Sequence, residues 1–327
     1  MTHWVGRIVR PLALITAIAA ITATSAYPAA APISDSAISV AVEAVVPPAL
    51  DYQVIPGVAI AVIRDGHLVF NREYGVRNVA KGEPVTQNTA FEIGSITKQF
   101  TAAAILQLKE RGKLKLTDRL GKYIPEYPRA KNVTIEQMLH MTSGIPDHIN
   151  DVPGAVQAIS SSEGSLDSVL ASIENLPLRH KPGTVSEYSN TNYLLLGTIV
   201  ARVSHMPYHD YIAKNIFAPT HMVHSAFLKD ENALPNMAKG YAVSPTGTLQ
   251  PVGHIGYGWS GGAGSIVSTT GDMALWDDAF FDGRILSKTD VKLATTPLYI
   301  NGTSTGYAFG WEDDTVDGLP IISHGGG

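Results

Sequence analysis

A serine and a lysine three positions apart, Ser95 and Lys98, carry the strongest chemical signal in the sequence. Residues with this spacing share one face of a helix, so a helix here would hold the serine hydroxyl beside the lysine amine. A buried lysine readily loses its proton, and a neutral amine beside a hydroxyl can activate it as a nucleophile. The pair therefore points to nucleophilic catalysis by Ser95.

The residues after Ser95 are predicted to form a helix. Apolar residues recur through residues 100–108, and Lys109-Glu110-Arg111-Gly112 ends the run with cations followed by glycine, which is typical of a helix C-terminus. Taken alone, however, Ser-x-x-Lys should occur about once by chance in such a chain. A helix start with a surface lysine is the better explanation of the isolated pattern, so a catalytic role requires further motifs in the chain.

The first partner is the tripeptide Tyr188-Ser189-Asn190. Pro182-Gly183 marks a turn before it, and the apolar residues 193–200 predict a helix after it, which places the tripeptide on a loop entering a helix. There a phenol can shuttle protons and an asparagine amide can hold a carbonyl. Tyr299-Ile300-Asn301 has the same spacing but neither the turn nor the helix, and it is set aside.

The second partner is His324-Gly325-Gly326-Gly327, the last four residues of the sequence. Ile321-Ile322 before it predicts the start of a strand. Glycines at this place let a substrate lie directly against the backbone.

The order Ser-x-x-Lys, Tyr-x-Asn and a Lys-Thr-Gly-type triplet resembles that of the serine β-lactamase and penicillin-binding protein superfamily. The surrounding sequence is similar to its class C-like branch, which also contains D-amino-acid peptidases, esterases and other serine hydrolases. Met141 is an unusual residue inside the segment that resembles the branch's His-Thr-Ser-Gly loop. The resemblance runs from about Pro56 to Gly327, and it is carried by residues 91–102, 139–145, 188–190, 261–274 and 307–311 together with the terminal triplet.

The resemblance implies an α+β fold with two lobes. One is an antiparallel sheet lobe flanked by helices, the other is all-helical, and the active site lies between them. The residues agree with this division: residues 58–70 predict a hairpin turned by Asp65-Gly66, about 113–235 predict a helical insert, and strand-like runs return afterwards. We expect one sheet to be built from both ends of the chain.

The resemblance also assigns roles. Ser95 attacks an amide, ester or lactam carbonyl and forms an acyl-serine, while Lys98 and Tyr188 handle the protons; which of the two is the general base stays open. Substrate binding falls to Asn190 and to the triplet His324, Gly325 and Gly326. The oxyanion hole uses the backbone N–H groups of Ser95 and Gly327. No cofactor and no metal are expected.

Histidine at position 324 departs from the better-known pattern, in which a lysine helps bind the β-lactam carboxylate. An unperturbed histidine is mostly neutral at pH 7, so weak β-lactam hydrolysis is expected. D-amino peptides, small esters and β-lactams all remain compatible substrates. A penicillin-binding or peptidoglycan-sensing domain that acylates without turnover is the alternative function.

Other motifs in the chain fit their families less well. Ser260 lies in a Gly-x-Ser-x-Gly pattern and, with His324, suggests an α/β-hydrolase, but residues 252–257 are too broken by glycine to form the strand which that elbow requires. The dinucleotide-like pattern Gly256-x-Gly258-x-x-Gly261 lacks a preceding strand and is better explained as a glycine-rich turn. Two histidine pairs, His205 with His209 and His221 with His224, are better explained as surface or capping residues than as metal ligands.

The two ends of the chain carry expectations of their own. Residues 1–26 resemble a signal peptide, with Arg7 and Arg10, an apolar core too short to span a bilayer comfortably, and a small-residue cleavage site at Thr24-Ser25-Ala26. Residues 27–327 would then form the hydrolase domain, in the periplasm or outside the cell and without stable membrane insertion. Because relatives continue past the triplet, we expect C-terminal strands and a helix to be missing after Gly327.

The resemblance implies a small molecule or a peptide as the partner, and composition argues against other classes. The formal net charge is −5 and becomes −7 once the signal segment is removed, which argues against nucleic acid and anionic membranes. The absence of cysteine rules out disulfides and thiol chemistry.

Overall fold

The computed structural model describes residues 34–53, 55–155, 159, 162–229 and 234–327. The predicted signal peptide lies outside these residues. Among the described residues, no helix has both the length and the apolar character needed to span a bilayer.

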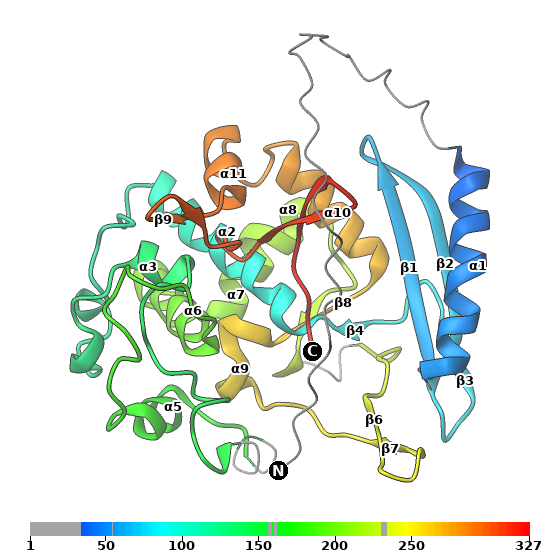
Figure 1. Cartoon of the computed structure of the whole chain (residues 1–327), viewed down its shortest axis with the longest axis horizontal. Coiled ribbons are helices and arrows are strands. Elements are labelled where there is room, and N and C mark those ends of the chain that lie inside the picture. The colour runs from blue at the N-terminus through cyan, green and yellow to red at the C-terminus, as the bar shows by residue number, and fades with distance from the viewer. Residues whose placement is uncertain (1–33, 54, 156–158, 160–161, 230–233) are drawn as a thin grey trace, which may run out of the picture.

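Helices and antiparallel strands both contribute to the structure, as the α+β prediction requires (Figure 1). The helices are α1 (Asp35–Gln53), α2 (Thr97–Glu110), α3 (Ile135–Leu139), α5 (Leu166–Ile173), α6 (Asn190–Ser204), α7 (Tyr208–Ile212), α8 (Ala218–Thr220), α9 (Tyr257–Gly264), α10 (Thr270–Phe281) and α11 (Lys288–Thr295). The strands are β1 (Gly57–Arg64), β2 (His67–Asn78), β3 (Glu83–Pro84), β4 (Phe91–Glu92), β5 (Ala226–Phe227), β6 (Tyr241–Val243), β7 (Leu249–Pro251), β8 (Ile266–Ser268), β9 (Tyr299–Ile300), β10 (Thr303–Ser304), β11 (Glu312–Val316) and β12 (Leu319–Ser323).

The first hairpin forms where the sequence predicts it. β1 and β2 pair antiparallel around Asp65 and Gly66, whose φ angles of 53° and 74° are the left-handed values that such a tight turn requires. α1 packs on β2, on the outer side of the hairpin (Figure 1).

The expectation of one continuous sheet is wrong, because the described strands form several small antiparallel sheets. β4, β8 and β5 make one of them, β1 with β2 and β3 another, and β11 with β12 a third. The chain after β12 does not pair with β1. It runs beside Ile93 and Gly94 instead, so the two hairpins stay separate.

α2 is the centre of the core. Its residues from Thr97 to Leu108 are all buried, and it packs against α6 and α9 (Figure 1). Phe100 stacks on Trp276 of α10 with ring centroids 4.1 Å apart. A helix buried on all sides is fixed by side chains that each contribute about 1.5–3 kcal/mol on burial. This core therefore holds the N-terminus of α2, where the candidate nucleophile lies, in a rigid place.

The predicted helical insert contains α3, α5, α6, α7 and α8, together with the short strand β5. α6 begins at Asn190, as the apolar run after the Tyr-Ser-Asn tripeptide predicts, and it packs directly on α2. The loop ahead of α6 is thereby brought next to the start of α2.

Candidate active site

Ser95 lies in a short 3-10 turn, Gly94–Ile96, that leads directly into α2. Lys98 follows in the first turn of α2, and its Nζ lies 2.8 Å from Ser95 Oγ. Lys98 has no exposed surface, so the alternative of a helix start with a surface lysine is wrong.

The amine of Lys98 has two further partners. Its Nζ lies 2.8 Å from Asn190 Oδ1 and 2.9 Å from the carbonyl oxygen of Ala263. Burial lowers the pKa of Lys98 to about 7, although the charge of Asp147 opposes this change. Near neutral pH, a large share of the molecules therefore carries a neutral amine, which has a lone pair to accept the proton of Ser95.

Tyr188 approaches the same hydroxyl from the loop before α6. Its phenol donates to Ser95 Oγ at 2.8 Å, and its ring centroid lies 4.8 Å from Lys98 Nζ. Burial raises the pKa of Tyr188 to about 12. At neutral pH the phenol thus keeps its proton and can donate it, whereas the neutral form of the lysine amine can accept a proton.

Asn190 is held by Asp147, a residue that the sequence analysis did not single out. The buried carboxylate of Asp147 accepts from Asn190 Nδ2 at 2.9 Å and from the N–H of Ile149 at 2.8 Å. It follows directly on residues 139–145, which carry part of the resemblance. An acidic residue next to Pro146 in such a segment was the available signal, but no local rule connects it with Asn190.

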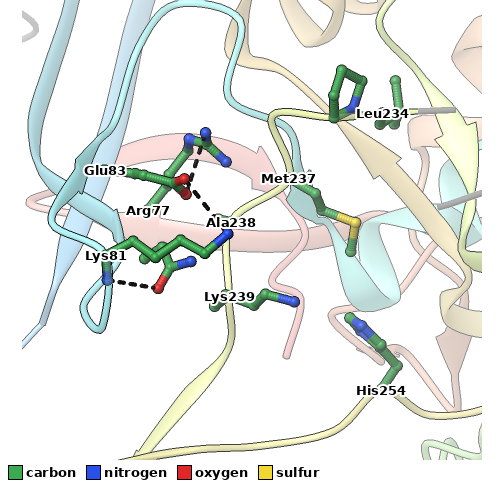
Figure 2. Close-up of a pocket in the computed structure, with 10 residues that line it drawn as sticks. Arg77, Lys81, Glu83, Leu234, Met237, Ala238, Lys239 and His254 are labelled. Carbon is green, nitrogen blue, oxygen red and sulfur yellow. Dashed lines mark hydrogen bonds and ion pairs between the residues drawn. The ribbon is translucent and has the colours of Figure 1, made fainter. Parts of the chain in front are cut away.

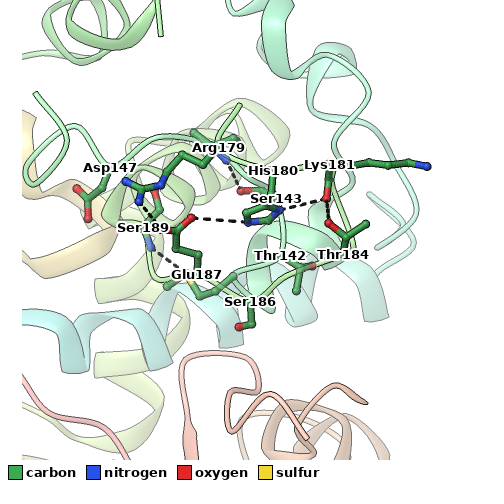
Figure 3. Close-up of polar contacts among 12 residues, drawn as sticks. Thr142, Ser143, Asp147, Arg179, His180, Lys181, Thr184, Ser186, Glu187 and Ser189 are labelled. Carbon is green, nitrogen blue, oxygen red and sulfur yellow. Dashed lines mark hydrogen bonds and ion pairs between the residues drawn. The ribbon is translucent and has the colours of Figure 1, made fainter. Parts of the chain in front are cut away.

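The loop that carries Tyr188 is anchored on the segment around Met141. Figure 3 shows Arg179 and Glu187 of this loop as an ion pair, with Nη2 and Oε1 2.5 Å apart. The N–H of Glu187 donates to the carbonyl oxygen of Met141 at 2.8 Å. Met141 has a φ of 58°, and its sulfur accepts from the N–H of Ser189 at 3.5 Å. The unusual methionine thus supports the tripeptide loop.

The terminal triplet lies against the segment that carries Ser95. A Cβ added at Gly326 would meet the carbonyl oxygen of Ile93 at 2.0 Å and the backbone nitrogen of Ser95 at 3.2 Å. Gly94 faces Gly327 in the same way: its added Cβ would lie 2.6 Å from the nitrogen of Gly327. Gly325 has open space around its Cα. The residues predicted to form the oxyanion hole are therefore neighbours in space.

His324 contacts Tyr307 rather than a charged partner. Its Nε2 lies 3.1 Å from the Tyr307 hydroxyl, and its Nδ1 lies 2.6 Å from the carbonyl oxygen of Gly325. Burial lowers the pKa of His324 below its ordinary value. The side chain is therefore neutral at pH 7 and offers no cation to a substrate carboxylate.

The competing motifs do not assemble into sites. Ser260 lies inside α9, where its Oγ donates to the carbonyl oxygen of Gly256 at 3.3 Å, so it has no strand-to-helix elbow. Of the glycines in the dinucleotide-like pattern, Gly256 caps the N-terminus of α9 and Gly258 lies inside it, so the expectation of a turn is wrong there, whereas Gly261 is non-helical, with a φ of 40°, and kinks the helix. His205 and His221 end α6 and α8 in left-handed conformations. Within the described residues, no three potential metal ligands form a group.

A pocket of about 310 Å³ lies outside the candidate active site (Figure 2). Its charged side chains include Arg77, Lys81, Glu83 and Lys239, and the carboxylate of Glu83 lies 3.3 Å from the guanidinium of Arg77. None of the candidate catalytic residues lines it, and its described lining residues include no serine. This pocket therefore shares no residue with the candidate site around Ser95.

The chain matches the protein family described as Beta-lactamase over residues 42–327. Among curated proteins, Protein flp of Staphylococcus aureus (strain N315) is 34% identical over 228 residues, which cover 68% of this chain and 45% of that protein. The matched region thus spans less than half the length of this relative.

Two solved structures share the fold. One is the octameric penicillin-binding protein homologue from Pyrococcus abyssi, with 28% identity and a TM-score of 0.78 over 88% of this chain and 68% of that one. The other is a D-stereospecific amidohydrolase from Streptomyces sp., with 27% identity and a TM-score of 0.72 over 86% of each chain.

Proposed function

Because this chain belongs to the beta-lactamase family, we propose that it is a serine hydrolase whose Ser95 forms a covalent acyl-enzyme with a carbonyl substrate. The observation that carries this proposal is the convergence on one hydroxyl. Ser95 Oγ lies 2.8 Å from both Lys98 Nζ and Tyr188 Oη, and the amine has a pKa of about 7.

In the proposed first step, neutral Lys98 takes the proton of Ser95 while Oγ attacks the substrate carbonyl carbon. The negative charge that develops on the carbonyl oxygen is stabilised by the N–H groups of Ser95 and Gly327. Tyr188 donates its proton to the leaving group and recovers one from the Lys98 ammonium. A water molecule, deprotonated by the same pair, then attacks the acyl carbon and releases Ser95.

We propose an amide or ester as the physiological substrate rather than a β-lactam. The similarity to a D-stereospecific amidohydrolase supports amide hydrolysis. The neutral state of His324 weighs against β-lactams, because the carboxylate that they carry finds no cation there. The signal-like first 26 residues support action in the periplasm or outside the cell.

A turnover panel tests the proposal. Nitrocefin, p-nitrophenyl acetate and a D-Ala-D-Ala peptide are each incubated with the wild type and with Ser95→Ala and Ser260→Ala. We expect Ser95→Ala to abolish all acylation, and we expect Ser260→Ala to stay within a few-fold of wild type because that serine lies inside α9. If Ser260→Ala is inactive while Ser95→Ala works, the nucleophile is assigned wrongly.

The same panel separates hydrolysis from sensing. Steady release of product supports the enzyme. Rapid labelling by a fluorescent penicillin, with no turnover of any substrate, supports instead a penicillin-binding or peptidoglycan-sensing domain that stalls as the acyl-enzyme.

A further inference from the structure

A cavity of about 350 Å³ opens beside Tyr188, on the proton-transfer side of the candidate active site. Its lining comes from strand β11, from residues 305–307 before that strand, and from Met141 and Ser186. Because the Tyr188 phenol also contacts Ser95 Oγ, a small substrate held at Ser95 would extend into this cavity.

The cavity has an acidic lining. Among the described residues that line it, Glu312, Asp313 and Asp314 are acidic, and none is a lysine or an arginine. The nearest basic groups of the catalytic site do not offset these charges: His324 is neutral, and the pKa of Lys98 is about 7. The cavity is therefore negatively charged at neutral pH.

Glu312 is the acidic residue placed to contact a substrate. Its backbone pairs with Ser323 at the start of β11, and within the described part of the chain its carboxylate has no ion pair or hydrogen bond. Asp314 lies on the exposed part of the strand, and its carboxylate already accepts from the N–H of Thr315 at 2.7 Å. Asp313 also lines the cavity, but adjacent residues of a strand leave it on opposite faces, so its carboxylate does not lie beside that of Glu312.

The carboxylate of Glu312 also acts on the catalytic groups. Burial is the main reason why the pKa values of Tyr188 and Tyr307 are raised, and the charge of Glu312 raises both further. The two rings lie edge to face with centroids 6.1 Å apart. Aromatic rings beside a carboxylate are the surroundings that favour an organic ammonium group.

We propose that Glu312 binds the ammonium group of the substrate, so that the enzyme prefers amino-acid amides and esters with a free amine over N-acylated or anionic ones. This substrate class rests on the proposed function, because it places the scissile carbonyl at Ser95 and the amine in the neighbouring cavity.

The first experiment compares D-phenylalanine p-nitroanilide with its N-acetyl derivative at pH 7. The wild type should show a kcat/KM at least about 10-fold higher for the free amine, mainly through KM, and Glu312→Gln should lose this preference. Asp317→Asn is the matched control, because it neutralises a carboxylate in the turn of the same hairpin but outside the cavity, and it should keep the preference. An unchanged preference in Glu312→Gln overturns the proposal.

A binding experiment gives the answer independently of turnover. In a Ser95→Ala background, calorimetry compares phenylalanine amide with N-acetyl-phenylalanine amide, with and without Glu312→Gln. Tighter binding of the free amine, lost on Glu312→Gln, supports the subsite even if the chain hydrolyses nothing, in which case only the proposed hydrolase function fails. Equal binding of the two amides excludes the subsite even in an active hydrolase.

Discussion

Asp147 accepts two hydrogen bonds from Asn190, one from the side-chain amide at 2.9 Å and one from the backbone N–H at 3.2 Å. These bonds direct the amide nitrogen toward the carboxylate and leave Oδ1 facing Lys98 Nζ at 2.8 Å. Asp147 therefore acts on the candidate base in two ways: it fixes the acceptor beside the amine, and its charge favours the protonated amine.

Replacing Asp147 by asparagine tests this relationship. Loss of hydrogen bonds to a charged group typically costs about 1.5–3 kcal/mol, so we expect kcat/KM for an ester to fall by about 10- to 100-fold. Because the charge of Asp147 raises the pKa of Lys98, the acidic limb of the pH profile should also move to lower pH.

The matched control for this change is Asp167→Asn, since Asp167 is exposed in the first turn of α5. Its pH profile should coincide with that of the wild type. An acidic limb that does not move in Asp147→Asn would show that the carboxylate has only a structural role.

The activity of the wild type should itself follow the titration of Lys98. With a pKa of about 7, the amine is increasingly neutral above pH 7, so kcat/KM for a neutral ester should rise through pH 6–8 and then level off. Lys98→Arg should lower kcat/KM by about 1,000-fold or more at every pH, because a guanidinium does not lose its proton in this range. A profile that is flat from pH 6 to 8 would contradict the role of Lys98 as the base.

The buried lysine also predicts a pH-dependent stability. Between pH 7 and 10.5, the unfolded chain binds a proton at Lys98 that the folded chain does not, so the free energy of unfolding rises with pH. Relative to Lys98→Met, the wild type should gain up to about 1.4 kcal/mol per pH unit in this window and nothing below it. Urea unfolding of both proteins at pH 6, 7, 8 and 9 measures the difference. A constant difference would mean that Lys98 stays protonated when buried.

The part of the site that could be predicted from sequence is the part set by local geometry. The three-residue spacing of Ser95 and Lys98 brings their side chains together where the 3-10 turn of Ser95 enters α2, and the turn and apolar run around Tyr188 define a loop before a helix. Asp147 and Glu312 depend on tertiary structure, because each reaches the site from a segment with no chemical pattern of its own.

The difference between local and tertiary signals also explains why the prediction of one continuous sheet is wrong. Alternation and turn residues predict individual hairpins, and β1 with β2 and β11 with β12 are found. Whether two hairpins join depends on what lies between them. Here the backbone of Gly326 packs against Ile93, a contact that no periodicity encodes.

His324 predicts weak β-lactam hydrolysis with a distinctive pH dependence. Because burial lowers its pKa, the imidazole becomes cationic only below its ordinary value of about 6.5. The ratio of nitrocefin turnover to ester turnover should therefore be low at pH 7 and rise only below about pH 6.5. Protonation of Lys98 slows both reactions, so its effect cancels in this ratio. His324→Lys should raise the ratio at pH 7. A ratio that stays constant from pH 5.5 to 8 would show that the charge of His324 does not control β-lactam hydrolysis.

The contact between the terminal triplet and the nucleophile segment can be tested by comparing two glycine-to-alanine variants. In Gly326→Ala, the new methyl group would overlap the carbonyl oxygen of Ile93 at 2.0 Å and approach the nitrogen of Ser95 at 3.2 Å. Both are backbone atoms, so the triplet itself must move away from Ser95, and the donor at Gly327 moves with it. Loss of one oxyanion donor typically costs about 10²–10³ in rate, and we expect a loss of this size in kcat for an ester. Gly253→Ala adds the same methyl group in the loop before α9, where it meets nothing within 4 Å, and should stay within a few-fold of wild type. Equal activity of the two variants would show that the triplet does not supply the oxyanion hole.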